Sequence, residues 1–395
     1  MNLRILLLLG ALSAFGPLAI DFYLPSFPAL ALAFATDVER VQLTLAVYFV
    51  GLAGGQLIYG PLADRFGRRR PLIFGVLLFS LASVVCALAS SLEWLIAARF
   101  LQALGGCAGM VIARAVVRDL CDPLASAKVF SQLMLVMGLA PILAPLAGGV
   151  LLDQFGWQSI FISLSLFSAL CGLAVAYWLP ETLAQHSTPA PLRGAPAQYL
   201  RLLKDRQFVG HALTGGLVMA GMFAYIAGSP FVFIELYQVP AQHYGWLFGS
   251  NAAGFILMAQ VNSWLLRRHG PAYWLHRVVW LYLAAAVSLL AVSLLQPAQL
   301  WPLLVPLFVA VASLGCLLPN ASACAMARQA AHAGSASALL GFIQFALAAS
   351  ASALVGLLHN GSAQPMAAVI SLCAVLAVIS ALATARSAAL VARRA

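Results

Sequence analysis

The sequence predicts an all-α membrane protein with twelve transmembrane helices arranged in two six-helix halves. Three observations lead to this prediction: the composition, the number of long apolar runs, and the distribution of basic residues. Of the 395 residues, 63% are hydrophobic and only 8% are charged, whereas soluble domains carry about 25% charged residues. Because no soluble core could bury so much apolar surface, the chain must lie in lipid. The runs are continuous rather than alternating, which disfavours a transmembrane β-barrel.

Each apolar run is long enough for a helix to cross a bilayer, which takes about 20 residues. The predicted spans of the first half are 4–26, 40–60, 72–91, 94–115, 127–151 and 157–179. Those of the second half are 209–234, 243–265, 275–296, 300–322, 336–358 and 366–388. The charged, proline-containing stretch 181–207 is expected to be a linker along a membrane face. We therefore predict an N-terminal six-helix bundle over 1–180 and a C-terminal one over 208–395.

The basic residues predict the orientation of these spans. With twelve spans, 19 of the 21 lysines and arginines fall on the side that holds both termini and the linker. Arg40 is on the opposite side, and Arg99 falls inside a span. Cytoplasmic loops carry the excess of basic residues, so both termini are expected in the cytoplasm. The net charge of +10 is therefore attributed to membrane orientation, and no basic cluster has the aromatic interleaving of a nucleic-acid binder.

The two halves repeat each other weakly at an offset of 203 residues. The matching pairs are Gly51 and Gly254, Leu62 and Leu265, Arg65 and Arg268, and Gly67 and Gly270. This alignment places the loop after the second span over the loop after the eighth. Two six-span halves related in this way are a known plan of secondary transporters.

The densest charged segment, 60–74, lies between the second and third spans and is expected to form a tight hairpin at the membrane face. Its candidate gating residues are Gly60, Asp64, Arg65, Gly67, Arg68 and Arg69. The two glycines permit close approach and a tight turn. An alternative interpretation, a pure topology signal, explains the arginines but neither Asp64 nor the glycines.

Asp64 has several possible partners in this hairpin. It could cap the third helix, meet the positive N-terminus of a second-half helix, or pair with Arg114 or Arg118. The three arginines from Arg68 to Arg70 are expected to face anionic headgroups or acids such as Asp119.

Asp21 is the carboxylate that the sequence places within a span, in the first apolar run. A charge at membrane depth costs on the order of 2.5–3.5 kcal/mol and usually marks function. Removal from water favours the protonated carboxyl and brings proton exchange toward neutral pH, as a proton-coupled carrier requires. The alternative is an acid wetted at the outer mouth of the span, because Pro25 and Pro28 leave the end of the span undefined.

Arg99 is a second charge within a span, the fourth. An arginine there needs a partner or a water-filled cavity. Its charge would oppose protonation of a nearby acid, and its withdrawal would favour proton uptake. The alternative is an arginine that extends to the outer headgroups, because Glu93 and Trp94 mark that interface nearby.

The fifth span contains two prolines four residues apart, Pro141 and Pro145, followed by Gly148 and Gly149. Each proline removes a backbone hydrogen bond, so a bend is expected. The glycines let a neighbouring helix pack closely. The bend could serve transport or be purely structural.

The transport cavity should be large, mostly apolar and sparsely polar. Candidate lining residues, each equally compatible with helix packing, are Tyr48, Gln56, Gln132, Tyr225, Phe231, Asn251, Asn320 and Gln344. The histidines and cysteines show no spacing typical of a metal site, and no cofactor is expected. A nucleotide-binding loop is lacking, so ATP drive is not supported. An enzyme would need a second catalytic group near Asp21, and no second carboxylate falls well inside a span.

These motifs together resemble those of a known family. The patterns G-x-L-A-D-R-x-G-R-R at 60–69, R-x-x-Q-x-x-G-G at 99–106 and the proline–glycine run of the fifth span occur in order, and 179–183 reads Leu-Pro-Glu-Thr-Leu. The chain resembles the major facilitator superfamily, and within it the bicyclomycin-resistance and chloramphenicol-efflux branch of the drug:proton antiporters.

The resemblance implies the major facilitator fold and export of small, mostly apolar drugs in exchange for protons. It also ties Arg99 to proton handling. Ala140 and Ala144 replace two glycines of the family's fifth-helix signature, which weakens the preference for export over import. A proton-coupled exporter or importer of a metabolite, with the same fold, is the alternative. We expect a monomer in the bacterial inner membrane whose partners are drug, proton and lipid.

Overall fold

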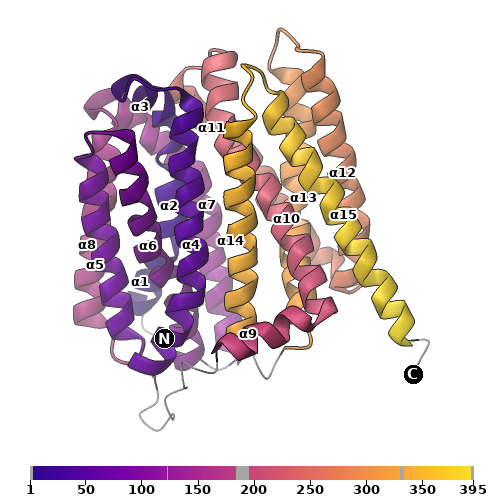
Figure 1. The fold of residues 1–395 in the computed structure, drawn as a ribbon. Coiled ribbons are helices and arrows are strands. Elements are labelled where there is room, and N and C mark those ends of the chain that lie inside the picture. The colour runs from indigo at the N-terminus through magenta and orange to yellow at the C-terminus, as the bar shows by residue number, and fades with distance from the viewer. Residues whose placement is uncertain (1–2, 122, 184–194, 330–332, 393–395) are drawn as a thin grey trace. The chain divides into compact units, whose positions relative to one another are not determined.

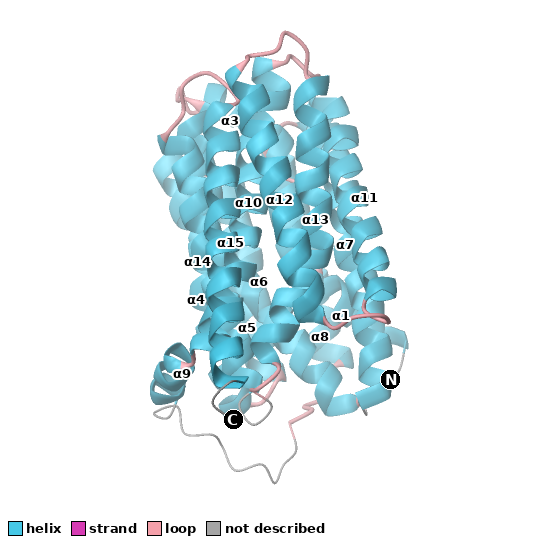
Figure 2. Ribbon diagram, turned by 90° about the vertical axis from the view of Figure 1, so that its right-hand side faces the viewer, coloured by secondary structure: helices cyan, strands magenta, loops and turns pink. Residues whose placement is uncertain are grey.

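The computed structural model describes residues 3–121, 123–183, 195–329 and 333–392, together with the side chains of most of them. Within this part of the chain the regular elements are all helical and no strand occurs (Figure 2). The chain divides into two compact units. Unit 1 comprises Met1–Ala195 with Ala241–Gly245, and unit 2 comprises Pro196–Pro240 with Trp246–Ala395. The boundary at 195/196 falls inside the stretch predicted as the linker.

Unit 1 is a bundle of antiparallel helices (Figure 1). Its elements are α1 (Leu3–Ser13), α2 (Phe15–Asp21), the 3-10 helix η1 (Leu24–Ser26), α3 (Phe27–Ala33), α4 (Val38–Phe66), α5 (Arg69–Ala87), α6 (Leu92–Leu120), α7 (Pro123–Phe155) and α8 (Gln158–Trp178). Unit 2 begins with a short helix and continues as a second bundle. Its elements are α9 (Ala195–Lys204), α10 (Arg206–Pro230), the π-helix η3 (Phe231–Leu236), α11 (Ala241–Leu265), α12 (Pro271–Leu294), α13 (Trp301–Met326), α14 (Ala333–Leu357) and α15 (Gln364–Ala392).

The prediction of an all-α membrane protein is confirmed. By length and composition, ten helical segments in the described part of the chain can cross a membrane. The two remaining predicted spans correspond to α7 and α11, whose described residues do not meet the same criteria of length and composition. Most observed boundaries lie within a few residues of the predicted ones.

The first predicted span, 4–26, is longer and more broken than expected. Four short helices cover Leu3 to Ala33, and the break after α2 directly follows Asp21. Proline explains the segmentation, because it lacks the N–H that continues a helix. Pro25 opens η1 and Pro28 opens α3. Asp21 therefore lies at an interruption of the first span.

The second predicted span, 40–60, was also too short. α4 continues to Phe66 and includes Pro61, so most of the charged motif is helical and the connection to α5 is only Gly67 and Arg68. The expectation of a tight turn is confirmed for Gly67, whose φ is +85°. The expectation is wrong for Gly60, which lies within α4, where an added Cβ atom would meet no other part of the described structure within 4 Å.

Glycines fix the packing of α6 against its neighbours in unit 1. A Cβ atom at Gly51 of α4 would lie 2.7 Å from Ala103, and one at Gly75 of α5 would lie 2.2 Å from Ala108. Gly105 of α6 in turn abuts the α5 backbone at Phe79. Backbones this close leave α4, α5 and α6 little room to slide.

The residues matched by the internal repeat occupy related places. Gly51 of α4 faces α6, and Gly254 of α11 faces Phe308 of α13. Gly67 lies between α4 and α5, and Gly270 lies between α11 and α12, directly before α12. Each unit therefore contains a similar arrangement of three consecutive helices, as the repeat in the sequence predicts.

Candidate functional site

Arg99 of α6 is fully buried in unit 1. Its Nη1 donates to Gln102 Oε1 (2.6 Å), and Gln102 Nε2 donates to Ser83 Oγ (2.7 Å) in α5. Both partner side chains are also buried. This chain of hydrogen bonds fixes one side of the guanidinium and excludes the alternative in which Arg99 extends to the membrane surface. Glu93, which marks that surface, pairs instead with Arg40 (3.3 Å).

Aromatic rings from three other parts of the chain surround the Arg99 guanidinium: the turn after α2, α4 and α8. Its Cζ lies 4.6 Å from the ring centre of Tyr23, 4.2 Å from that of Tyr48 and 5.9 Å from that of Phe161. A desolvated cation over aromatic faces gains about 2 kcal/mol or more. The Tyr23 hydroxyl forms a hydrogen bond with Thr44 Oγ1 (2.7 Å), which holds its ring in place. The rings therefore provide much of the solvation that Arg99 loses on burial.

The Arg99 guanidinium keeps unused donors in this enclosure. Nε and Nη2 have no hydrogen-bond partner among the described residues. An unsatisfied charged donor at this depth is costly, so these two nitrogens, which carry three N–H groups, can bind an acceptor that reaches the site. The arrangement is suited to holding a cation whose partner changes.

Asp21 is also buried, with 3% of its surface exposed. No hydrogen bond or ion pair of its carboxyl group is found in the described part of the chain, so Asp21 and Arg99 do not form a salt bridge. Tyr23, two residues later, connects the two sites because its ring lies over Arg99. Burial of Asp21 does not support the alternative of an acid wetted at the mouth of the span.

Gly148 of α7 packs on the backbone beside Asp21. A Cβ atom at this position would lie 2.1 Å from the Phe22 carbonyl oxygen. The predicted close packing is therefore confirmed for Gly148. Pro145 and Gly149 are buried in the same helix, whereas the side chains of Pro141 and Gln132 lie outside the described part. α7 is continuous through both prolines.

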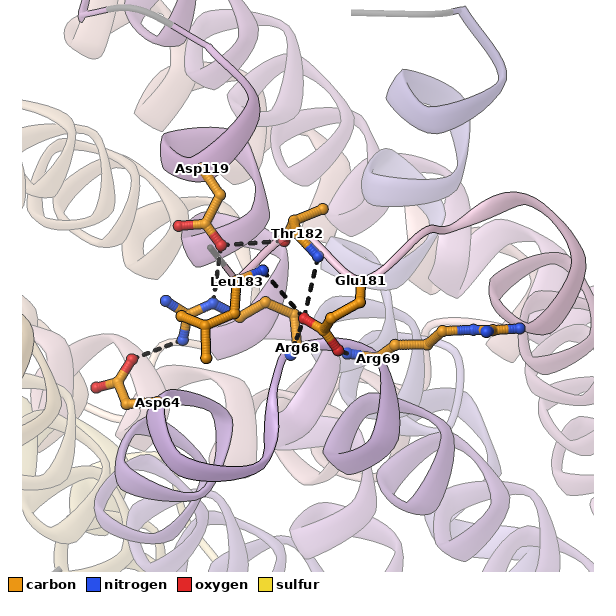
Figure 3. Close-up of polar contacts among 7 residues, drawn as sticks. All are labelled: Asp64, Arg68, Arg69, Asp119, Glu181, Thr182 and Leu183. Atoms are coloured by element: carbon orange, nitrogen blue, oxygen red, sulfur yellow. Dashed lines mark hydrogen bonds and ion pairs between the residues drawn. The ribbon is translucent and has the colours of Figure 1, made fainter. Parts of the chain in front are cut away.

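A second polar site, the α4–α5 cluster, lies at the end of unit 1 where α4 passes into α5 (Figure 3). Its members come from four places in the chain: Asp64, Arg68, Arg69, Asp119, Glu181 and Thr182. Arg68 is its centre. Its Nη1 donates to Asp64 (2.6 Å) and its Nε to Asp119 (2.9 Å) at the end of α6. Partial burial lowers the pKa of Arg68, but these two carboxylates outweigh it and raise the pKa, so the guanidinium stays charged.

Glu181, which follows α8, closes the cluster. Its carboxylate accepts hydrogen bonds from the backbone N–H groups of Arg68 (2.7 Å) and Arg69 (3.2 Å). These amides begin α5, so Glu181 caps that helix and meets the positive end of its dipole. Thr182 donates to Asp119 (3.0 Å). The segment after α8 is therefore fastened to α5 and α6.

The charge of Glu181 is stabilised by this capping. Partial burial raises its pKa, but backbone N–H groups of Arg68, Leu183, Arg69 and Thr182 outweigh it, so the pKa of the carboxyl group is lowered. Gly67 is required for this contact, because a Cβ atom there would lie 2.3 Å from Glu181 Oε2.

The sequence-based expectations for this cluster are partly confirmed. Arg68 pairs with Asp119 as predicted, and it is too buried to bind headgroups. Asp64 does not cap α5 and pairs with Arg68 rather than with Arg114. Arg65 lies over the Phe66 ring (5.4 Å), and Arg69 donates to the Ala176 carbonyl of α8.

Several candidate cavity residues are engaged within their own unit. Asn251 donates to the Tyr225 hydroxyl (3.2 Å), and the amides of Asn320 and Asn262 bond to each other across α13 and α11. Phe231 packs edge-on against His359. Such contacts favour the helix-packing alternative for these residues. Gln56 and Tyr48 are buried, and neither Gln56 Nε2 nor the Tyr48 hydroxyl has a hydrogen-bond partner in the described structure. Gln344 of α14 is half-buried.

Comparison with known proteins decides the family. The sequence profile described as Major Facilitator Superfamily matches residues 7–353. The chain belongs to the major facilitator superfamily. It is a multi-pass membrane transporter. Among the described residues no group of three or more histidines, cysteines or acids could hold a metal.

Relatives of this transporter include several with descriptive names. It is 39% identical over 350 residues to the uncharacterized MFS-type transporter YdgK of Bacillus subtilis, covering 87% of this chain and 86% of the relative. It is 31% identical to the bicyclomycin resistance protein homolog of Haemophilus influenzae, covering 95% and 94%. Over 234 residues, 59% of each chain, it is 32% identical to the multidrug resistance protein MdtL of Salmonella heidelberg.

Two solved structures share the fold of this superfamily member. One is an inward-facing, occupied bacterial homologue of the human lysosomal transporter Spinster, with a TM-score of 0.70, 15% identity, and coverage of 97% of this chain and 96% of that one. The other is the xylose transporter XylE from E. coli, with a TM-score of 0.72, 14% identity and 96% coverage of each chain. At these identities the similarity shows the fold alone.

Proposed function

We propose that this transporter exports small, mostly apolar drugs in exchange for protons, and that Asp21 binds the proton. The observation that carries the proposal is a buried carboxyl group without a partner, at the break of the first span. A carboxyl enclosed among apolar groups is stable with its proton, and one reached by water can lose it. Alternation between these two situations is what exchange of a proton for a drug requires.

Arg99 is the second component of the proposed mechanism. Its free N–H groups would bind the Asp21 carboxylate after proton loss, once a rearrangement brings the two together. Protonation of Asp21 would release Arg99 to its aromatic enclosure. Each charge state of Asp21 then favours a different local arrangement, so proton binding is coupled to conformation.

The α4–α5 cluster is proposed to act in alternating access. Half of the Asp64 side chain is exposed, so its carboxylate can bind a further partner while Arg68 holds it in place. Contacts of this cluster would break and re-form during the transport cycle.

Drug substrates are proposed from the relatives named for bicyclomycin and multidrug resistance. The sparsely charged interior supports a mostly apolar substrate, since Asp21 and Arg99 are the charged side chains fully enclosed in the described spans. We further propose a monomer in the bacterial cytoplasmic membrane with both termini in the cytoplasm.

The test is transport by the purified protein in vesicles with an imposed pH gradient, with labelled bicyclomycin and chloramphenicol as substrates. Wild-type protein is expected to accumulate drug against its gradient. Asp21→Asn should abolish this accumulation, on the order of a tenfold loss or more, while drug-for-drug exchange continues. Asp37→Asn, which removes an exposed carboxylate before α4, is the matched control and should transport normally.

Two results would contradict the proposal in different ways. Accumulation by Asp21→Asn at the wild-type rate would show that another group carries the proton. Transport of neither drug by the wild-type protein, with proton-linked uptake of a metabolite instead, would favour the alternative of a metabolite carrier.

A further inference from the structure

α9 has one face built into unit 2. Leu202 is buried in an apolar cluster with Phe208 of α10 and Leu339 of α14. Gln198 accepts a hydrogen bond from Ser335 (3.0 Å) at the start of α14. The helix crosses the end of unit 2 at a steep angle to α10 and α14 (Figure 1). These contacts fix α9 to the bundle, so it is part of unit 2 rather than a free linker.

The opposite face of α9 is exposed and amphipathic. Leu200 and Leu203 are 60% and 48% exposed, and they lie next to each other because residues three apart share a helix face. Arg201 and Lys204 are exposed beside them. Adjacent apolar and basic stripes on a helix that lies across a bundle are typical of helices in the plane of a membrane interface.

The sequence from Pro196 onward is strongly positive. From Pro196 to the C-terminus the acids are Asp205 and Glu235, against ten arginines and lysines. Asp205 is occupied, because it accepts from the N–H groups of Gln207 and Phe208 and from Gln329. Arg201, Lys204 and Arg206 form no ion pair within the described residues. Their charges are therefore available to an anionic partner.

We propose that α9 is a binding site for anionic phospholipids. Leu200 and Leu203 insert among the acyl chains at the membrane surface, and Arg201, Lys204 and Arg206 bind lipid phosphates. A lipid fits better than a soluble anion, because the exposed leucines need an apolar environment beside the phosphates. The spans α10 and α14, to which α9 is fastened, place it at the height of the headgroups. Lipid bound there acts directly on unit 2.

The test measures amide hydrogen exchange of residues 197–204 in the full-length protein. The protein is placed in nanodiscs of phosphatidylcholine alone or mixed with phosphatidylglycerol. Exchange should be on the order of tenfold slower with the anionic lipid, and raising salt from about 0.1 M to about 1 M should remove most of the difference. Native mass spectrometry should show phosphatidylglycerol retained by the protein.

Two sets of substitutions locate the site. The triple variant Arg201→Gln, Lys204→Gln, Arg206→Gln should weaken phosphatidylglycerol binding roughly 100-fold, since each basic residue near an anionic surface contributes about fivefold. Arg267→Gln with Arg268→Gln, which removes charge from the end of α11, is the matched control and should retain binding. Exchange in the middle of α12 reports whether each variant is folded.

Three outcomes would overturn the proposal. The first is equal protection of α9 in both lipids, which would show that apolar contacts alone hold the helix. The second is equal loss of binding in the control variant, which would assign the effect to the overall charge of this end. The third is lipid-dependent protection that salt does not change. The salt and lipid comparisons use the wild-type protein and do not depend on the folding of any variant.

Discussion

Arg99 illustrates how a single charge is kept in a membrane-spanning bundle. Two tyrosine rings and a phenylalanine ring cover the guanidinium, and Gln102 holds one of its nitrogens. The rings stabilise the cation without neutralising it, unlike a carboxylate partner. Arg99 therefore remains able to respond to a nearby negative charge, which a permanent salt bridge would prevent.

Glu181 makes the stability of the protein depend on pH. The pKa of Glu181 is lowered in the folded state from its ordinary value of 4.5. The stabilisation that its carboxylate contributes is therefore complete above pH 4.5. It is lost as the pH falls through the lower pKa of the folded protein. Glu181→Gln should remove it, and loss of a helix cap costs about 0.5–2 kcal/mol. The difference in thermal unfolding temperature between wild type and variant should be constant above about pH 4.5 and shrink below it. A difference that grows on acidification would contradict this role.

Individual residues differ in how far the sequence could predict them. Asp21 and Arg99 were predictable because a charge inside an apolar run is rare and has few explanations. The sequence shows Glu181 only as part of the Leu-Pro-Glu-Thr-Leu motif, and its capping role is not predictable because its partner Arg68 lies 113 residues earlier. The rings around Arg99 were missed for the same reason, although Tyr48 was expected to line the cavity. Contacts between distant segments need the fold before they can be seen.

The turn between α4 and α5 depends on one glycine. Gly67 has φ +85° and ψ 171°, a conformation that is almost restricted to glycine, and it faces Glu181. Gly67→Ala is expected to destabilise the protein by about 1–3 kcal/mol. It should also slow transport several-fold, because the added methyl group displaces the Glu181 carboxylate that caps α5. Thermal unfolding and vesicle transport measure the two effects.

Gly60→Ala is the control for that substitution. Gly60 belongs to the same motif but is helical and has open space around it in the described structure. Alanine there should be neutral or stabilise the helix by up to about 1 kcal/mol. If Gly60→Ala and Gly67→Ala impair stability and transport equally, the turn at Gly67 is not the reason that the motif requires glycine.

Element boundaries show where apolar patterning is informative. The lengths of most spans were predicted well because hydropathy reports what the bilayer requires. The helical continuation of α4 through the charged motif was missed because charge, not helix propensity, suggested a loop. α9 was missed within the predicted linker, because proline and charge dominate the composition there while a single buried residue, Leu202, anchors the helix.

The orientation of the whole protein follows from its basic residues. The 19 lysines and arginines assigned to one side predict that reporter domains fused after Pro180 and at the C-terminus are both cytoplasmic. A reporter fused at Gly156, in the turn between α7 and α8, lies on the predicted outer side and should report the periplasm. A periplasmic signal from either of the first two fusions would refute the twelve-span topology.

The fold of the molecule was more predictable than its site. Six-helix halves follow from hydropathy, charge bias and the repeat, which are properties of the whole chain. The division between the two units falls at 195/196, within the stretch 181–207 predicted as the linker, whereas Ala241–Gly245, predicted in the C-terminal bundle, belong to unit 1. How a drug is recognised was not predictable, because polar residues such as Asn320 serve equally well in packing, where the structure finds it bonded to Asn262.

Translation delivers the parts of the α4–α5 cluster at very different times. Asp64 and Arg68 leave the ribosome early, and Glu181 follows Arg68 by 113 residues. Until Glu181 is made, the start of α5 has no cap. Arg68 likewise has no ion pair with Asp119 until α6 has been made. Glu181 emerges only after α1 to α8 have been made. We therefore expect the cluster to form only once these helices are complete, and a nascent chain that stalls before Glu181 to expose an uncapped α5 to membrane proteases.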